Sequence, residues 1–257
     1  MPLTPDHRPP EIPGYTLREE IGRGGMSVAY LATDNRLKRR VAIKVMLDRH
    51  LARTEDRARF QAEAETMARL QHPNITQVFE VGVHEGLAYC VLEFAAGGSL
   101  DRFLRGRPQL PRLAALTSIV LADAIHAAHQ QGIVHRDLKP SNVLVNAVHA
   151  GPTATGSSTQ SLERVKIPEG LKISDFGLAK RLDEESGLTK TGMILGPPNY
   201  MPPEQAAGRS DLAGPLSDVY SLGAMLYEML TGRPPFAGPT AVETIMLVQA
   251  AEPIPPR

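Results

Sequence analysis

The segment His135–Asn142 constrains this chain more than any other part of the sequence. It reads HRDLKPSN and places an imidazole, a carboxylate, an ammonium group and an amide directly before the apolar run 143–145. An aspartate there can accept a hydroxyl proton, a lysine can neutralise a phosphoryl group, and an asparagine oxygen can bind a hard cation. A polar loop that only joins a helix to a strand is the alternative, and this crowding of chemical groups argues against it. The sequence therefore predicts a catalytic site that includes Asp137, Lys139 and Asn142.

A second carboxylate, Asp175, follows the strand-like run 171–174 and begins the tripeptide Asp175-Phe176-Gly177. The tripeptide says little by itself. Together with Asn142, however, it offers two oxygen ligands from two loops that flank strands, and Mg²⁺ usually takes few protein ligands besides waters and phosphates. Asn142 and Asp175 are therefore the candidate ligands of Mg²⁺.

Glycines gather in the segment 21–27, which reads IGRGGMS and lies between two strand-like runs. Glycine lets backbone N–H groups approach phosphate oxygens closely. A glycine-rich β-turn without a ligand is the alternative. A Rossmann fold is disfavoured because residues 28–31 favour a strand where that fold needs a helix, and no Walker phosphate loop occurs in the chain. The segment is a candidate cover for nucleotide phosphates.

Lys44 lies between apolar residues in the strand-like segment Val41-Ala42-Ile43-Lys44. An unpaired ammonium group would be costly to bury there, so it needs an anionic partner. Glu63, on the helix predicted next, can supply one, and a lysine paired in this way can still hold phosphate oxygens. A surface lysine on a strand edge is the alternative.

The chain begins with a proline-rich tail at 1–11 and continues with a β-rich part at 12–94. Alternating or continuous apolar residues bounded by turn residues predict the strands of this part. A helix is predicted at 55–70, because Phe60, Ala64, Met67 and Leu70 fall on one helical face. The predicted strands are 15–21, 28–33, 41–47, 78–83 and 87–94.

From residue 95 to residue 257 the sequence favours helices, with predicted helices at 113–130, 217–230 and 240–251. A stretch rich in serine, threonine, glycine and alanine at 147–170 separates two short strand-like runs, which indicates an insertion in a hairpin loop. A surface loop without function is its alternative reading. A β-rich lobe followed by a helical lobe predicts an α+β fold with two lobes.

Composition excludes several classes of protein. The 28 Lys and Arg residues balance 28 Asp and Glu residues, so no net field would draw the chain to nucleic acid or to an anionic membrane. A single cysteine, Cys90, rules out a disulfide framework and fits a cytoplasmic location. Its apolar surroundings predict that it is a small core residue. No apolar run is long enough to span a membrane, and the N-terminus has no secretory signal.

Taken together and in order, these motifs resemble those of the protein kinase family. The matching segments are GxGGMS, VAIK, a helix glutamate, HRDLKPSN, DFG, PPE in place of APE, and DVYSLG. This set of motifs is most similar to that of bacterial serine/threonine kinases of the eukaryotic type. The resemblance implies a two-lobed kinase fold, with ATP and Mg²⁺ as cofactors and protein serines and threonines as substrates.

The resemblance also implies a role for each matching residue. Asp137 is the expected catalytic base, Lys139 the γ-phosphate partner, and Asn142 and Asp175 the metal ligands. Lys44, positioned by Glu63, is expected to hold the α- and β-phosphates. Ile21, Gly22, Gly24, Gly25 and Ser27 are expected to cover ATP, and Ala29 matches the position that usually covers the adenine. Leu92 is the expected gatekeeper, and the backbones of Glu93 and Ala95 are expected at the adenine edge.

An arginine before the catalytic aspartate resembles kinases that are switched by phosphorylation of the activation segment. Phosphate on that segment can pair with Arg136. Thr189 and Thr191 are the candidate phosphosites, which predicts autophosphorylation and transient self-association. Solvated loop threonines without such a role are the alternative.

The sequence departs from the family pattern at several positions. Ser27 replaces the third glycine, and Ala29 stands where a valine is usual. Pro197 occupies a position where the family usually has a threonine whose hydroxyl contacts the catalytic loop, and proline offers neither hydroxyl nor N–H. These changes put nucleotide affinity and substrate positioning in question, and an inactive pseudokinase that binds a partner is the rival interpretation.

The family also continues beyond the position that matches Arg257. We therefore expect a partial C-terminal lobe, in which the arginine that usually pairs with the Glu204 position is missing and apolar surface of 219–230 and 240–251 is exposed. Asp218, on the first of these helices, matches the aspartate of the DVYSLG motif.

Overall fold

The computed structural model describes residues 9–24, 27–47, 67–147, 169–176 and 198–256. The chain forms two compact units. The first comprises Met1–Gln71 and Gln77–Phe94, and the second comprises His72–Thr76 and Ala95–Arg257. The two units correspond to the β-rich and helical lobes that the sequence predicts.

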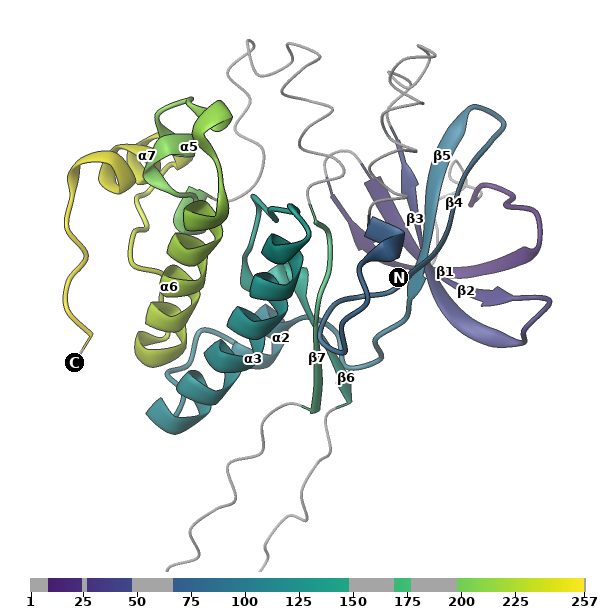
Figure 1. The fold of residues 1–257 in the computed structure, drawn as a ribbon, viewed down its shortest axis with the longest axis horizontal. Coiled ribbons are helices and arrows are strands. Elements are labelled where there is room, and N and C mark those ends of the chain that lie inside the picture. The colour runs from purple at the N-terminus through teal and green to yellow at the C-terminus, as the bar shows by residue number, and fades with distance from the viewer. Residues whose placement is uncertain (1–8, 25–26, 48–66, 148–168, 177–197, 257) are drawn as a thin grey trace, which may run out of the picture. The chain divides into compact units, whose positions relative to one another are not determined.

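The first unit is built on a five-stranded antiparallel sheet in the order β1-β2-β3-β5-β4 (Figure 1). All five strands predicted from the sequence are present, and their ends lie within two residues of the predicted ends. The strands are β1 (Tyr15–Arg23), β2 (Ser27–Asp34), β3 (Arg39–Met46), β4 (Val78–His84) and β5 (Leu87–Glu93).

Alternation of side chains along β3 explains how this sheet forms its core. Val41, Ile43 and Val45 are buried on one face, whereas Ala42 and Lys44 point to the other face. These β-branched residues fit a pleated, half-buried surface. They pack with further buried side chains of the same unit, namely Ile12, Ala32, Tyr89 and Val91.

Most of the helix predicted at 55–70 lies outside the described residues. Residues 67–69 are helical, with Met67 and Leu70 buried, as the predicted apolar face requires.

A two-stranded hairpin in the second unit directly follows the predicted catalytic segment, His135–Asn142. It pairs β6 (Val143–Ala147) with β7 (Glu169–Ile173) in antiparallel register, and the predicted insertion lies in its loop, outside the described residues. The segment His72–Thr76 extends the hairpin on one side, because Ile75 bridges to Ile173 in parallel. On the other side, the Gly97 N–H donates to the Val145 carbonyl at 2.8 Å.

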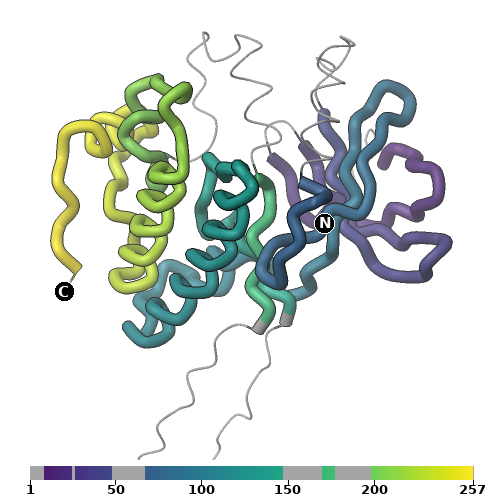
Figure 2. Tube along the Cα trace, viewed as in Figure 1, coloured from purple at the N-terminus to yellow at the C-terminus, as the bar shows by residue number. Residues whose placement is uncertain are grey.

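Helices α3 (Pro111–Gln130) and α6 (Pro215–Thr231) pack side by side in the second unit (Figures 1 and 2). Proline at the first position begins each helix, where the absent N–H costs no hydrogen bond. Helix α6 ends at Gly232, whose φ of 76° is the left-handed conformation that glycine tolerates. The third predicted helix, α7 (Ala241–Ala250), begins at Thr240, whose Oγ1 accepts from the Glu243 N–H at 3.1 Å.

Two short helices were not predicted, α2 (Leu100–Leu104) and α5 (Pro203–Ala206). Single-turn 3₁₀ helices form at Pro140–Asn142, Pro198–Tyr200 and Ser210–Leu212. Elements this short offer too few residues for a helical periodicity to be recognised.

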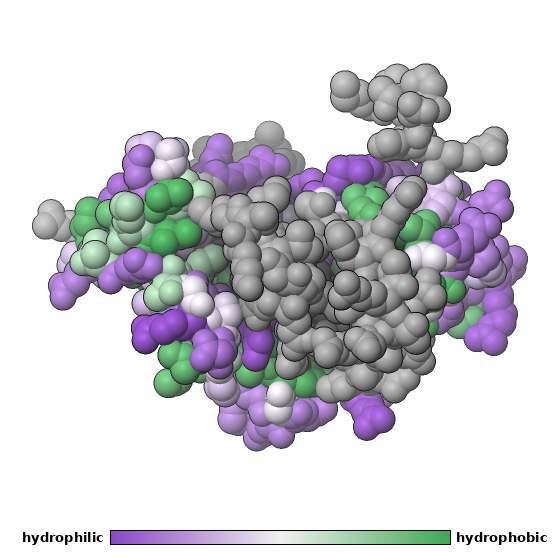
Figure 3. Space-filling view, turned by 90° about the horizontal axis from the view of Figure 1, so that it is seen from above, coloured by the Kyte–Doolittle hydropathy of each residue, from purple (hydrophilic) through white to green (hydrophobic). Residues whose placement is uncertain are grey.

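Apolar side chains are exposed on helices α6 and α7 of the second unit. Figure 3 shows them on the side where Figure 1 places α5 and α7. On α6, Leu216 is 82% exposed and Val219 is 56% exposed, and on α7 Met246 is 62% exposed. The exposure of apolar surface predicted for 219–230 and 240–251 is thus confirmed for Val219 and Met246.

Candidate active site

The catalytic segment forms a loop between α3 and the 3₁₀ turn before β6, and His135 anchors it in the core. The His135 ring is fully buried and packs against the Phe176 ring, with 4.6 Å between centroids. Its Nδ1 accepts from the Asp137 N–H at 3.2 Å, and its Nε2 lies 2.9 Å from the Ser174 carbonyl oxygen. Nε2 must therefore carry the proton. Burial lowers the pKa of His135, which keeps the ring neutral.

The three predicted catalytic side chains lie together in this loop. The Lys139 Nζ lies 2.7 Å from the Asp137 Oδ2, and the Asn142 Nδ2 donates to the same oxygen at 3.1 Å. The Asn142 Nδ2 also donates to the Asp137 carbonyl at 2.8 Å. A carboxylate with about a third of its side-chain surface exposed can still receive a substrate hydroxyl (31% for Asp137). The loop thus presents one acceptor and one cation to the same small region.

Asp175 follows β7 within the same unit, and its backbone is unusual. Its φ is 63°, a left-handed conformation that is uncommon for residues other than glycine and is frequent at functional sites. The neighbouring Ser174 N–H donates to the Asn142 carbonyl at 2.8 Å, which ties the two candidate ligand loops together. Because the Asn142 Nδ2 is directed at Asp137, its Oδ1 points away from that residue.

The donor set of Asn142 and Asp175 fits a hard divalent cation, because one amide oxygen and one carboxylate are oxygen ligands. No cluster of three or more His, Cys, Asp or Glu residues that could hold a metal occurs among the described residues. A site with two protein ligands is compatible with that finding.

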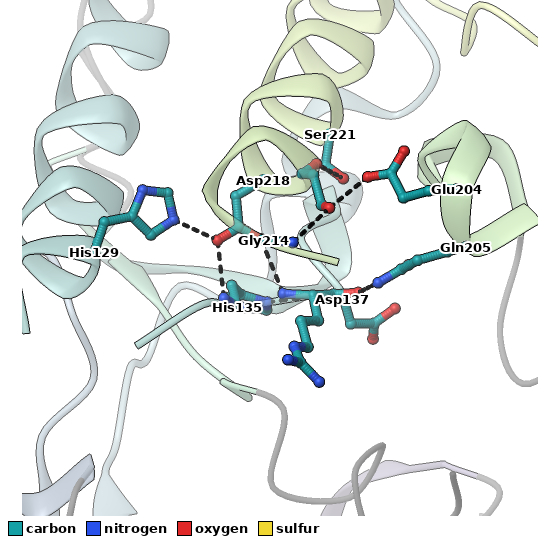
Figure 4. Close-up of polar contacts among 10 residues, drawn as sticks. His129, His135, Asp137, Glu204, Gln205, Gly214, Asp218 and Ser221 are labelled. Carbon is teal, nitrogen blue, oxygen red and sulfur yellow. Dashed lines mark hydrogen bonds and ion pairs between the residues drawn. The ribbon is translucent and has the colours of Figure 1, made fainter. Parts of the chain in front are cut away.

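Asp218, at the start of α6, holds the backbone of the catalytic loop (Figure 4). Its side chain is fully buried, and its two oxygens accept from the His135 N–H at 2.8 Å and from the Arg136 N–H at 2.9 Å. The His129 Nε2, from the end of α3, lies 2.7 Å from the same carboxylate. A buried carboxylate needs such partners.

Glu204 has a partner within the described residues. Its carboxylate accepts a hydrogen bond from the Ser217 hydroxyl, and the Ser217 Oγ in turn accepts from the Gly214 N–H at 3.1 Å (Figure 4). The first turn of α6 therefore supplies a local partner for Glu204, the residue that the resemblance expects to pair with an arginine.

The predicted nucleotide-binding residues of the first unit fall on four strands and on the connection between β1 and β2. Ile21 and Gly22 lie on β1, Ser27 and Ala29 on β2, and Lys44 on β3. Ala29 pairs with Gly22 on one side and with Lys44 on the other. The Gly24 N–H donates to the Ser27 carbonyl at 2.8 Å. Leu92 and Glu93 end β5, and Ala95 begins the second part of the second unit.

Five predicted functional positions lie outside the described residues. They are Gly25, Glu63, Thr189, Thr191 and Pro197.

Sequence reasoning missed two residues that support the loop, namely His129, which acts through Asp218, and Gln205. Each acts through a contact with a residue far away in the sequence, such as the 89 positions between His129 and Asp218. The only local signal was a polar side chain at a position that faces the core, and His129 shows it at the end of an apolar helix.

No helix among the described residues has the length and apolar character that crossing a membrane requires.

Comparisons relate the chain to known proteins. The family model described as a protein kinase domain matches residues 15–252. The chain is 38% identical over 250 residues to the serine/threonine-protein kinase PknB of Mycobacterium leprae. The matched region covers 94% of this chain and 36% of that protein. The chain is 40% identical over 248 residues to PknA of Mycobacterium tuberculosis, with 94% of this chain and 52% of that protein covered. The chain thus spans at most about half the length of these relatives.

Proposed function

Because the chain belongs to the protein kinase family, we propose that it transfers the γ-phosphoryl group of ATP to serine or threonine side chains of proteins. The observation that carries this proposal is the arrangement of Asp137, Lys139 and Asn142 around one carboxylate oxygen. Kinase catalysis depends mainly on positioning and on neutralising charge, and this loop supplies groups for both.

In the proposed reaction, the substrate hydroxyl oxygen attacks the γ-phosphorus while the bond to the β,γ-bridging oxygen breaks. Asp137 accepts the hydroxyl proton, and Lys139 neutralises charge on the transferred group. The divalent metal that this family uses is proposed to be Mg²⁺, which would be held by Asn142 and Asp175 and would offset phosphate charge. ADP and a phosphorylated protein leave.

The glycines at 22 and 24 support the proposed nucleotide role of the first unit. A Cβ added at Gly22 would lie 3.9 Å from the Ala29 Cβ, and one at Gly24 would lie 3.8 Å from Ser27. Neither glycine has a positive φ. The fold itself therefore does not require glycine at either position, whereas close approach of a phosphate would. Lys44 is proposed to hold the α- and β-phosphates, paired with Glu63.

The remaining nucleotide contacts are proposed from the family pattern. Ile21, Gly25 and Ser27 would cover ATP, Ala29 would lie over the adenine, and the backbones of Glu93 and Ala95 would contact adenine beside the gatekeeper Leu92.

Regulation by phosphorylation also belongs to this proposal. Thr189 and Thr191 are the proposed phosphosites, and Arg136 would pair with the phosphate they carry. Transfer between two copies of the chain, and a cytoplasmic location, are proposed with it.

Transfer of ³²P from γ-labelled ATP to a general serine/threonine substrate tests the proposal. We expect Mg²⁺-dependent incorporation by the wild-type chain and a loss of at least a hundredfold in Asp137→Asn, because general base catalysis contributes roughly 10²–10⁴-fold. Asp211→Asn is the matched control, since Asp211 is exposed in a 3₁₀ turn of the same unit. Binding of Mg-ATP without incorporation would overturn the kinase assignment and favour a pseudokinase.

A further inference from the structure

The backbone of Arg136 is strained, and this residue directly precedes Asp137, the proposed catalytic base. Its φ is 65°, which residues with a Cβ rarely adopt. Such a conformation persists only when its surroundings hold it. Asp218 holds the peptide before Arg136, because it accepts from the Arg136 N–H at 2.9 Å.

The next peptide joins Arg136 to Asp137 and is held at both of its polar ends. Its N–H, on Asp137, donates to the His135 Nδ1 at 3.2 Å. Its carbonyl, on Arg136, accepts from the Gln205 Nε2 at 3.2 Å. Figure 4 shows the Gln205 side chain reaching from α5 toward this loop. Only the amide nitrogen can donate to a carbonyl, so the orientation of the Gln205 amide is fixed by this contact.

Stability alone does not account for an amide at this position. Gln205 is 8% exposed, and its Oε1 is buried without a hydrogen-bond partner in the described part of the chain. A buried acceptor that stays unpaired costs free energy, and an apolar side chain of similar size would avoid that cost. The donor half of the amide, which reaches Arg136, is what distinguishes glutamine from such a replacement.

We propose that Gln205 is a positioning residue for the catalytic loop. It fixes the orientation of the Arg136–Asp137 peptide from the carbonyl side, while Asp218 fixes the preceding peptide, and together they set the direction of the Asp137 carboxylate. This inference rests on the proposed kinase function of Asp137. It also links α5, which follows the segment 177–197, directly to the catalytic loop.

Gln205→Met tests the proposal because methionine has a similar length and no donor. We expect kcat to fall about threefold to tenfold, as loss of one buried hydrogen bond implies, while KM for ATP stays unchanged. The thermal unfolding midpoint should change little, because removal of the unpaired Oε1 offsets the loss of the hydrogen bond to the Arg136 carbonyl. Gln205→Glu keeps the shape but turns an acceptor toward the Arg136 carbonyl, so its kcat should fall below that of Gln205→Met.

Gln249→Met is the matched control. The Gln249 Nε2 donates to the Ala206 carbonyl of the same short helix at 2.6 Å, but Gln249 is exposed on α7 and makes no hydrogen bond to the loop among the described residues. Wild-type kcat is expected in this variant. A loss equal to that of Gln205→Met would mean that any loosening of α5 lowers activity, and it would overturn a specific role for Gln205.

Amide hydrogen exchange, read residue by residue by NMR, tests the positioning role without relying on activity. In Gln205→Met, the Asp137 amide should exchange faster, while amides in the middle of α3 keep their wild-type rates. An inactive wild-type chain would overturn the proposed function, and the exchange result alone would then decide the role of Gln205. Unchanged exchange at Asp137, faster exchange throughout the unit, or a wild-type kcat in an active Gln205→Met chain would each overturn the positioning role.

Discussion

The free energy of unfolding should depend on pH through His135, because its imidazole is buried in neutral form. Burial lowers its pKa from the usual value of 6.5, so the unfolded chain binds a proton that the folded chain does not. The free energy of unfolding should therefore fall as pH drops below 6.5, with a slope of up to about 1.4 kcal/mol per pH unit from this group. Urea unfolding between about pH 7.5 and about pH 5.5 measures that slope.

A pair of variants isolates the contribution of this ring. His135→Phe keeps a ring beside Phe176 and removes the titrating group, so its stability should depend less on pH over this range. His126→Phe, on the exposed face of α3, should keep the wild-type slope. Equal slopes in all three proteins would show that His135 does not titrate differently on unfolding.

Asp218 illustrates how much one buried carboxylate can stabilise. In Asp218→Asn, one oxygen becomes an NH₂ group that faces either a backbone N–H or the His129 ring, and at least one buried donor loses its partner. We expect the free energy of unfolding to decrease by about 2–4 kcal/mol. Denaturant unfolding measures this, with the exposed Asp211→Asn as control. A decrease below about 0.5 kcal/mol, typical of surface substitutions, would contradict the argument.

At the scale of elements, two glycines should respond to alanine in opposite ways. A Cβ at Gly82 on β4 would meet the Tyr89 hydroxyl oxygen at 2.5 Å, whereas one at Gly223 on α6 meets nothing within 4 Å. The Tyr89 hydroxyl donates to Glu80 at 2.8 Å, and burial and this partner raise its pKa to about 12, so the ring is held in place.

Gly82→Ala should therefore destabilise the first unit by about 1–3 kcal/mol through overpacking. Gly223→Ala should stabilise the second unit by about 0.5–1 kcal/mol, because glycine in an exposed helix is unfavourable. Differential scanning calorimetry of both variants gives the two shifts. An unchanged unfolding midpoint in Gly82→Ala would show that the Tyr89 ring can move away from the added Cβ without a cost in stability.

The sequence predicted the sheet well because its strands carry local signals. In β3 the buried valines and isoleucine alternate with Ala42 and Lys44, and turns separate β2 from β3 and β4 from β5. The segment His72–Thr76 gave no such signal. It joins the second unit through the Asn74 side chain, which donates to the Leu171 carbonyl at 2.8 Å, and through a single bridge to β7. Pairing across about a hundred residues cannot be read from a local pattern.

The residues of the candidate site fall into the same two groups, those that a local motif predicts and those that it does not. Residues proposed to act on phosphoryl groups lie in short motifs, so Asp137, Lys139 and Asn142 could be named from the sequence, and their proximity is now described. Residues that hold those motifs in place could not be named. Gln205 contacts the loop from α5, and His129 on α3 contacts Asp218, which holds the loop, so only the folded chain brings these residues together. Membership of the kinase family, predicted from the ordered motifs, is confirmed.

At the scale of the whole molecule, residues assigned to one nucleotide come from both units. Lys44 belongs to the first unit, and Asn142 and Asp175 belong to the second. A ligand that binds only the folded chain raises its stability by RT ln(1 + [L]/Kd), about 2.7 kcal/mol at a hundred times Kd. If the proposed roles hold, Mg-ATP must raise the stability of both units, and substitution of a proposed contact must reduce that rise.

We therefore expect Lys44→Met and Asp175→Asn each to reduce the rise in unfolding midpoint that saturating Mg-ATP produces in the wild-type chain. Lys38→Met and Asp211→Asn, which change exposed side chains of the same types in the same two units, should keep the full rise. Calorimetry with and without Mg-ATP measures all five proteins, and EDTA should remove the part that depends on metal. A full rise in Asp175→Asn that EDTA still reduces would place the metal on other residues. A rise confined to one unit of the wild-type chain would show that the nucleotide contacts only that unit, and the roles assigned in the other would then be wrong.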